Sequence, residues 1–283
     1  MKTGRRLGVH TSIAGGVHLS LERAAKLGCS TMQIFSHNPR QWSVVNIPGE
    51  EVSQFKRLRD FYDIGPVFIH SSYLINLCSV DKGVLSKSVQ LLLKEMELAD
   101  VLGAEYVILH TGSASQDIGG KARKRAVQAL RTVFGRCEWT ARLLLENTAG
   151  ERGDISSRII DLAEIIEKSG SASIGGICLD TCHAFQAGYE ISSEAGVKDM
   201  AEEIKAHIGL DTVKLVHLND SKRAFNSRVD RHEHIGGGHI GKEGLKYLIN
   251  HPAFRNVPLI LETPRKSEED DPKNLKVVRG LLS

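Results

Sequence analysis

The chain has 283 residues, of which 41% are hydrophobic and 25% charged, and its net charge is +3, a composition typical of a folded globular protein. The length suits an α/β barrel, and the small net charge does not by itself indicate a nucleic-acid partner. The sequence shows no signal-peptide pattern and no apolar run long enough for a membrane helix. The five cysteines form no C-x-x-C pair, so we expect reduced, mostly buried thiols in a cytoplasmic protein that does not act at a membrane.

Short β-rich apolar runs alternate along the whole chain with longer amphipathic stretches. The runs expected to form strands are residues 6–12, 31–37, 66–72, 106–112, 142–148, 176–181, 213–220 and 257–264. Near-continuous apolar strands joined by helices favour parallel pairing with both faces buried. Eight strand–helix units in this length predict an α/β fold of the (β/α)8 TIM barrel type, with an open doubly wound sheet as the alternative. No linker divides the chain, so a single domain is expected over residues 1–283.

Two of the intervening segments show helix boundaries. Residues 87–103 are amphipathic and end at Gly103, a suitable cap, and residues 156–170 are expected to open at Ser156 or Ser157 and close at Gly170. The glycine-rich segment 221–241 instead predicts a functional loop.

The predicted strands share a feature at their ends. Histidine or an acidic residue closes seven of them, namely His10, His70, His110, Glu146, Asp180, His217 and Glu262, and the second closes with Ser36 and His37. The chain has only 12 histidines and 34 acidic residues among 283, so chance would place far fewer at eight strand ends. Parallel strands of a barrel all end around one mouth, where we expect these side chains to meet.

A ring of neutral imidazoles and carboxylates with few Lys or Arg residues would repel itself unless cations were bound. This mixture of nitrogen and oxygen donors suits zinc, manganese or iron, and zinc tolerates it especially well. For any single histidine the alternative is a hydrogen-bonded core residue, but for the set we favour metal ligation. Cys182, between Asp180 and His183, is interpreted as a small core residue rather than a ligand.

The glycine-rich loop supplies further donors. Asp230 and His232 are two apart on an extended segment, which places both side chains on one side, as a chelate requires. Together with His183 they can complete a separate three-ligand site. His234 and His239 are alternative ligands that we interpret as polar loop residues.

The same loop contains a near match to a nucleotide-binding motif. The stretch from Gly236 fits G-x-x-x-x-G-K, but Glu243 replaces the Ser or Thr of a P-loop and no strand leads directly into it. Nucleotide binding is therefore not expected here, and Glu243 is interpreted as an acid in the first turn of a helix.

Several long motifs occur in order along almost the whole chain: HSSYLINL (70–77), LENTAG (145–150), CLDTCHAFQAGY (178–189), HLNDSK (217–222), SRVDRHEHIGGGHIG (227–241) and LILETP (259–264). Through them the sequence resembles the endonuclease IV family of apurinic/apyrimidinic DNA repair nucleases. A lone D-x-x-H would not be specific, but this ordered set is. The resemblance implies a TIM barrel that holds three zinc ions at its carboxyl-terminal mouth.

The resemblance also implies how the zinc ligands are divided. The first ion takes His70, His110 and Glu146; the second takes Glu146, as a bridge, with Asp180, His217 and Glu262; the third takes His183, Asp230 and His232. Glu146 and Glu262 would be catalytic, because Glu146 holds the metal pair that activates the attacking hydroxide and Glu262 orients it. The implied reaction is hydrolysis of the phosphodiester 5′ to an abasic site, leaving a 3′-hydroxyl and a 5′-deoxyribose phosphate, with trimming of blocked 3′ ends.

By the same resemblance, loops after the second and third strands enter the DNA duplex at the lesion. The matching positions are Arg40, Tyr73 and Leu74, which can wedge and stack where a base is missing. The alternative is that Tyr73 and Leu74 are ordinary core residues. His37 stands where many members have Lys and Ser71 where an Asp can occur, departures that concern DNA affinity rather than activity. The implied partner is double-stranded DNA with abasic sites or blocked 3′ ends, bound by a monomer.

Two other functions fit part of the pattern. Metal-dependent sugar isomerases and epimerases share a barrel with histidines and carboxylates at its mouth, but they need fewer metals and a small pocket. The number of matched ligands and the long loop 221–241 argue against them. A non-catalytic DNA- or metal-binding module would be expected to lack at least one ligand, and none is missing from the sequence.

Overall fold

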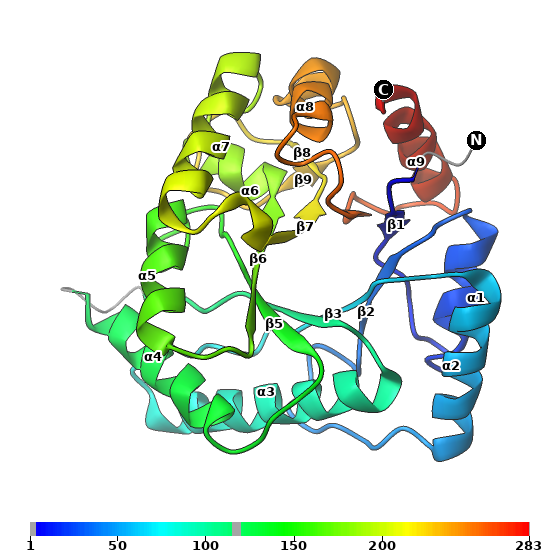
Figure 1. Cartoon of the computed structure of the whole chain (residues 1–283), viewed down its shortest axis with the longest axis vertical. Helices are drawn as coiled ribbons and strands as arrows, with labels where there is room; N and C mark the ends of the chain where they lie inside the picture. The colour runs from blue at the N-terminus through cyan, green and yellow to red at the C-terminus, as the bar shows by residue number, and fades with distance from the viewer. Residues whose placement is uncertain (1–3, 115–119, 283) are drawn as a thin grey trace.

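The computed structural model describes residues 4–114 and 120–282, and its main sheet contains eight strands (Figure 1). These barrel strands are β1 Leu7–Val9, β2 Met32–Phe35, β3 Val67–His70, β4 Tyr106–Leu109, β5 Arg142–Glu146, β6 Ile174–Asp180, β7 Val213–His217 and β10 Leu259–Leu261. All neighbouring pairs run parallel, in the order β1-β10-β7-β6-β5-β4-β3-β2. Each strand lies within or overlaps a predicted run, so the predicted succession of strands is confirmed.

The first and last strands of this order, β1 and β2, meet and close the sheet. His10 and Gln33 form a parallel bridge, and the amide of Thr11 donates to the carbonyl of Gln33 at 2.8 Å. The sheet is therefore a barrel, as predicted, and the open doubly wound alternative is wrong.

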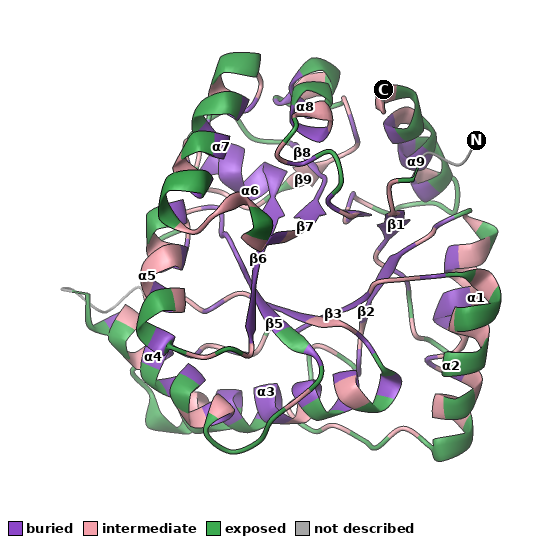
Figure 2. Ribbon diagram, viewed as in Figure 1, coloured by how far each residue is buried: buried purple, intermediate pink, exposed green. Residues whose placement is uncertain are grey.

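Helices surround the barrel (Figure 1). They are α1 Leu19–Lys26, α2 Gly49–Tyr62, α3 Lys82–Leu102, α4 Lys121–Phe134, α5 Ile159–Ser169, α6 Thr181–Gln186, α7 Glu194–His207, α8 Gly241–Asn250 and α9 Asp270–Leu281. Figure 2 shows buried residues on the faces that meet the sheet and exposed residues on the outer faces. Among the described residues, no helix has the length and apolarity needed to cross a membrane.

Helix boundaries agree with the sequence at their carboxyl ends and differ at their amino ends. Gly103 and Gly170 cap α3 and α5 in the left-handed conformation, with φ of 71° and 62°. The prediction that Ser156 or Ser157 opens α5 is wrong, because Arg158 is the N-cap. The Ser156 hydroxyl instead accepts a hydrogen bond from Thr111 Oγ1 at 3.0 Å, a contact that local sequence does not reveal.

Along each strand, side chains that fill the barrel interior alternate with side chains that face the helices. Six interior residues form one buried cluster: Phe68, Ile108, Leu144, Cys178, Leu215 and Ile260. Side chains two residues apart on a strand point to the same face. The residues that follow this cluster by two positions are His70, His110, Glu146, Asp180, His217 and Glu262. An apolar layer therefore supports a layer of histidines and carboxylates at the carboxyl-terminal mouth.

The predicted loop 221–241 contains no helix up to the start of α8. The start of the loop pairs with its middle in a short antiparallel hairpin of β8 (Asp220–Ser221) and β9 (His232–Glu233). This hairpin brings the middle of the loop back over the barrel mouth.

Candidate metal centre

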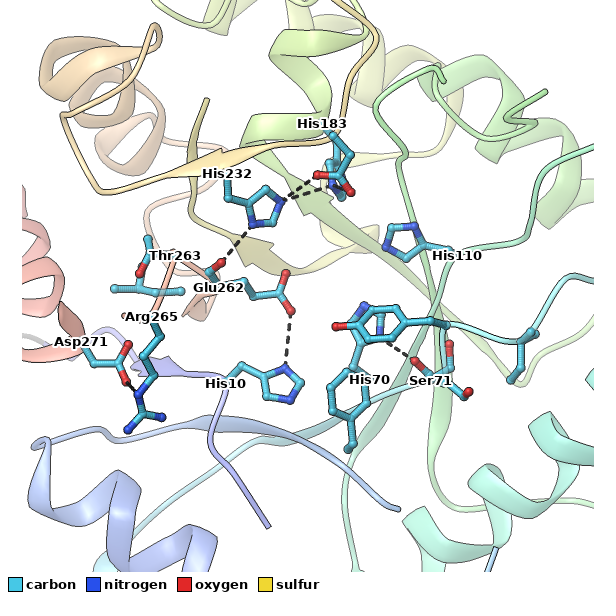
Figure 3. Close-up of a pocket in the computed structure, with 16 residues that line it drawn as sticks. His10, His70, Ser71, His110, His183, His232, Glu262, Thr263, Arg265 and Asp271 are labelled. Atoms are coloured by element: carbon cyan, nitrogen blue, oxygen red, sulfur yellow. Dashed lines mark hydrogen bonds and ion pairs between the residues drawn. The ribbon is translucent and has the colours of Figure 1, made fainter. Parts of the chain in front are cut away.

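A cavity of about 430 Å³ opens at the barrel mouth (Figure 3). Its walls include His10, His70, His110, His183, His232 and Glu262, and Figure 3 shows that these labelled side chains converge on one space. His70 is the last residue of its strand, whereas His10, His110 and Glu262 come directly after theirs. The strand ends that the sequence singled out thus meet in one cavity.

Apart from two groups that include a cysteine, the converging donor atoms of the described residues form three groups, in each of which they lie within 4.8 Å of one another. The groups are His70, His110 and Glu146; Glu146, Asp180, His217 and Glu262; and His183, Asp230 and His232. The first two groups share Glu146. The structure thus brings all nine expected ligand residues together, and these three groups have the same members as the sets that the family resemblance implies.

Glu146 lies at the centre of these groups and is completely buried. Its Oε2 is 3.0 Å from His110 Nε2 and 3.3 Å from His70 Nε2, while its Oε1 is 2.9 Å from His217 Nδ1. One carboxylate oxygen therefore faces each of the two groups. Within the described part of the chain the Oε2 atom makes no hydrogen bond of good geometry, although both imidazoles lie close to it, so a cation bound between them would satisfy it.

Hydrogen bonds fix which nitrogen of three histidines faces the cavity. The Nδ1 atoms of His70, His183 and His232 each lie 2.8–3.0 Å from a backbone carbonyl, of Ser71, Asn147 and Glu262 respectively. Since a carbonyl only accepts, each Nδ1 is the protonated atom and each Nε2 is left with a lone pair that faces the cavity. A backbone carbonyl bound to one ring nitrogen is typical of histidines that ligate metals through the other.

The third group shows the need for a cation most directly. His183 Nε2 lies 3.4 Å from His232 Nε2, and Asp230 Oδ2 lies 3.2 Å from His183 Nε2. When both rings are neutral and carry their protons on Nδ1, these two nitrogens present lone pairs that repel each other at this distance. A metal ion bound by both nitrogens and by Asp230 removes the repulsion, so this donor set fits a transition metal.

Gln33 fixes the orientation of His217, and sequence analysis did not identify it. Its Oε1 accepts from His217 Nε2 at 2.7 Å, and its Nε2 donates to Glu262 Oε1 at 2.5 Å. This arrangement turns His217 Nδ1 toward Glu146 and toward Glu262 Oε2, which is 3.2 Å away. The signal in the sequence was a polar residue inside the apolar run of the second strand.

Two asparagines are further positioning residues that sequence analysis missed. Asn219 Nδ2 donates to Asp180 Oδ2 at 2.7 Å, and Asn147 Oδ1 accepts from the amide of Asp180 at 2.8 Å. Both are buried and stand one or two residues after a candidate ligand, at Glu146 and His217. They hold Asp180 in place without facing the cavity.

The ionisation of the site reflects its crowding. Burial disfavours the charged form of Glu146, but the positive charges of His110 and His217 outweigh burial and hold the pKa of this carboxyl well below its usual range. Burial likewise lowers the pKa of His183, but Asp180 and Asp230 raise it well above that of a free imidazole. The carboxylates and imidazoles of this cluster thus stabilise one another's charged forms.

The cysteines do not compete for this role. Four of the five, Cys29, Cys78, Cys178 and Cys182, are buried, as expected. Cys178 and Cys182 lie close to candidate ligands, but burial raises the pKa of the Cys178 thiol to about 12 and that of Cys182 further still. Cys182 donates to the carbonyl of Arg231 at 3.4 Å, consistent with a small core residue.

Comparison with known proteins identifies the family. Residues 21–281 match the family described as xylose isomerase-like TIM barrel. A probable endonuclease 4 from Halothermothrix orenii is 40% identical over 276 residues, covering 98% of this chain and 99% of the relative. The chain belongs to the endonuclease IV family. The crystal structure of endonuclease IV from Thermus thermophilus superimposes with a TM-score of 0.85 at 38% identity, covering 98% of each chain.

As a member of the endonuclease IV family, the chain is a metal-dependent nuclease. A D-tagatose 3-epimerase-like protein also superimposes, with a TM-score of 0.75 over 98% of this chain and 97% of that one, but at 21% identity. This likeness concerns the barrel fold and explains why a sugar epimerase fitted part of the sequence pattern. The much higher sequence identity to the endonuclease relatives makes the epimerase interpretation wrong.

The glycine-rich loop of this family member is held by a single buried carboxylate. Asp220 Oδ2 accepts from the amides of Gly236 and Gly238, and Oδ1 accepts from those of Ile240 and Gly241, at 2.9–3.3 Å. A Cβ on Gly238 would lie 2.3 Å from the carbonyl oxygen of Ser221, so only glycine fits there. The amides that a P-loop would offer to phosphate are thus already bound, which agrees with the sequence prediction.

Other residues of the loop behave as predicted. His239 is exposed, His234 Nδ1 lies 3.0 Å from Asn274 Nδ2, and neither joins a group of converging donors in the described part of the chain. Glu243 is exposed in the first turn of α8.

The three predicted DNA contacts lie on two loops beside the cavity. Tyr73 is 67% exposed, which makes its interpretation as a core residue wrong, and Arg40 is also exposed, whereas Leu74 is half-buried. The Tyr73 ring packs edge-on against Phe35 at 5.3 Å. Ser72 Oγ donates to the carbonyl of Pro39 at 2.7 Å and so joins the two loops.

Proposed function

We propose that the chain hydrolyses the phosphodiester 5′ to abasic sites in double-stranded DNA. The observation that supports this most strongly is the arrangement of donor groups around Glu146, beside an exposed Tyr73. The name endonuclease 4 of the relatives supports a nucleic-acid substrate. Trimming of blocked 3′ ends would use the same site, because it breaks the same kind of bond next to a similar damaged sugar.

We propose that the three donor groups hold three zinc ions. Nitrogen and carboxylate donors in sets of three and four suit zinc. When bound, zinc lowers the pKa of water and neutralises charge on a phosphate and its leaving oxygen. Because one chain supplies all nine donors, the proposed site needs no second copy, and a monomer suffices.

In this proposal Glu146 and Glu262 have different tasks. Glu146 presents one oxygen to each of two groups and so fixes their separation. Glu262 is half-buried, and its Oε1 is held by Gln33 and lies 3.6 Å from His10 Nδ1. Held in this way, Glu262 can accept a hydrogen bond from the attacking water and orient it toward phosphorus.

Lesion recognition falls to the loops that carry Arg40, Tyr73 and Leu74. An abasic site lacks a base to stack, so inserting a side chain there costs less than in intact DNA. Tyr73 offers a ring for the neighbouring base, and the exposed Arg40 offers a cation for the backbone.

The decisive variant is Glu146→Gln, because it preserves side-chain volume and removes the charge. We expect incision of a duplex with a synthetic abasic site to fall at least roughly 100-fold, with the circular dichroism spectrum unchanged because the barrel core is untouched. Glu243→Gln, at an exposed acid on α8, is the matched control and should cut normally. Near wild-type cutting by Glu146→Gln would refute the assignment.

A further inference from the structure

A second hollow of about 570 Å³ lies beside the metal cavity. Its walls come from the segments after β1 and β2, and include Ile13, Ala14 and Pro39. It shares His10, Phe35 and Arg265 with the metal cavity. The two hollows therefore adjoin, and among residues 4–114 and 120–282 Arg265 is the one Lys or Arg side chain that lines both.

Arg265 is oriented by a buried acid. It lies in the segment between β10 and α9, and its Nε is 3.3 Å from Oδ2 of Asp271 (Figure 3). The Asp271 side chain is 8% exposed and that of Arg265 47%. Within the described part of the chain, the terminal nitrogens of Arg265 have no hydrogen-bond partner. One edge of the guanidinium is thus anchored, and its other donors remain for a ligand.

The nearby acids do not occupy those donors. Asp270 Oδ2 accepts from the amides of Lys266 and Ser267 at 2.8 and 2.7 Å, which draws it back onto its own loop. Asp271 contacts Arg265 through Nε alone. An anion can therefore approach the guanidinium from the side of the cavities.

The arrangement matches the chemistry of a DNA strand, in which each phosphate links two nucleosides. A guanidinium binds phosphate through paired hydrogen bonds, with a planar geometry that lysine lacks. With the damaged nucleotide in the metal cavity, the strand that continues past Arg265 has room in the second hollow. That hollow is lined by His10, Phe35 and Pro39, which suit a sugar or base better than a second phosphate.

We propose that Arg265 binds a phosphate adjacent to the one that is hydrolysed, and so sets the register of the strand. This inference rests on the proposed function, since it assumes that the metal cavity receives DNA. It assigns a phosphate contact to a residue outside the donor groups and outside the loops of Arg40 and Tyr73.

The test is a scan of single methylphosphonates, which remove the charge of one phosphate at a time, along an abasic duplex. Wild type should lose affinity at several positions. The variant Arg265→Gln should bind the unmodified duplex roughly tenfold more weakly than wild type does. At one position next to the scissile phosphate, a methylphosphonate that weakens binding by wild type should not weaken binding by this variant any further. The slope of log Kd against log salt should also fall by about 0.9 for this variant.

Arg255→Gln is the control, because Arg255 is exposed before β10, at the opposite end of the barrel. This variant should lose affinity at the same methylphosphonate positions as wild type and should have the same slope of log Kd against log salt. The proposal is overturned if Arg265→Gln keeps the wild-type scan and slope, or if its scan differs at no position beside the scissile phosphate. Failure of the proposed function is distinct, because wild type would then neither bind nor cut the unmodified abasic duplex.

Discussion

Glu95 shows how a single residue supports the DNA-facing loops from behind. It is buried on α3, and its Oε1 accepts from the amide of Ser72 at 2.8 Å and lies 3.7 Å from His37 Nδ1. Glu95 therefore touches both loops that carry the proposed DNA contacts. Burial raises the pKa of Glu95 to about 8 and lowers the pKa of His37, so both groups are neutral near pH 7.

This raised pKa predicts a pH-dependent stability. Between pH 4.5, the usual pKa of a glutamate side chain, and about pH 8, the Glu95 carboxyl is neutral in the folded chain and ionised in the unfolded chain. Unfolding in that window releases a proton, so the contribution of Glu95 to stability is present below pH 4.5 and is lost as pH rises toward 8. The loss amounts to about 1.4 kcal/mol per pH unit. The variant Glu95→Gln cannot titrate and should gain stability relative to wild type over this range.

Urea unfolding of wild type and Glu95→Gln at pH 5.5 and pH 8 measures the effect, with both proteins in the same zinc buffer. The difference between their free energies of unfolding should shift in favour of Glu95→Gln at the higher pH. If the free energy of unfolding changes by the same amount in both proteins between pH 5.5 and pH 8, Glu95 does not titrate in this window.

Among the elements, the glycine-rich loop depends on one side chain. The Asp220 carboxylate accepts hydrogen bonds from five backbone amides, those of Ser221, Gly236, Gly238, Ile240 and Gly241. The same loop carries Asp230 and His232, which face His183 on α6. The position of the third donor group therefore depends on a residue that does not belong to it.

Removing that carboxylate should release one metal. In Asp220→Ala the buried amides lose their acceptor, at a cost of about 1–3 kcal/mol each where water cannot replace it. We expect zinc content to fall by about one ion per chain and thermal stability to fall with it. Glu243→Ala, an exposed acid in the same segment, should change neither. Full zinc content in Asp220→Ala would mean that the loop is positioned by other contacts.

The loop after β3 should recognise DNA without holding metal. Tyr73→Ala should weaken binding to an abasic duplex by an amount corresponding to one stacking contact, about 1–3 kcal/mol, while zinc content stays unchanged. Phe61→Ala, an equally exposed aromatic near the end of α2, is the control and should bind normally. The comparison needs isotherms at one salt concentration.

His232→Ala provides the reverse result, with loss of a metal and of cutting while DNA binding largely remains. If Tyr73→Ala binds and cuts abasic DNA like wild type, Tyr73 has no part in recognition.

At the scale of the whole molecule, the sequence predicted what each strand specifies by itself. The apolar runs and the residues that end them follow from local chemistry, so the barrel and residues such as His70 and Glu146 were predictable. The sequence carries a further signal: each candidate ligand at the ends of β3 to β7 and of β10 follows an interior residue by two positions, as His70 follows Phe68.

Contacts between distant segments were not predictable from one sequence. Gln33 meets His217 across 184 residues, and Asp220 holds amides that lie some fifteen to twenty residues later. Both are polar residues whose purpose appears only once the barrel has closed and the loop has folded back. The start of α5 was missed for the same reason, because Ser156 is engaged by Thr111.

The central claim is that the barrel mouth is one site for three metal ions, and metal content tests it most directly. The nine donors fall into three groups, two of which share Glu146. Elemental analysis of protein purified without chelators should return about three transition-metal ions per chain, mainly zinc, and about two for His232→Ala. One ion or fewer per chain of correctly folded wild type would contradict the account.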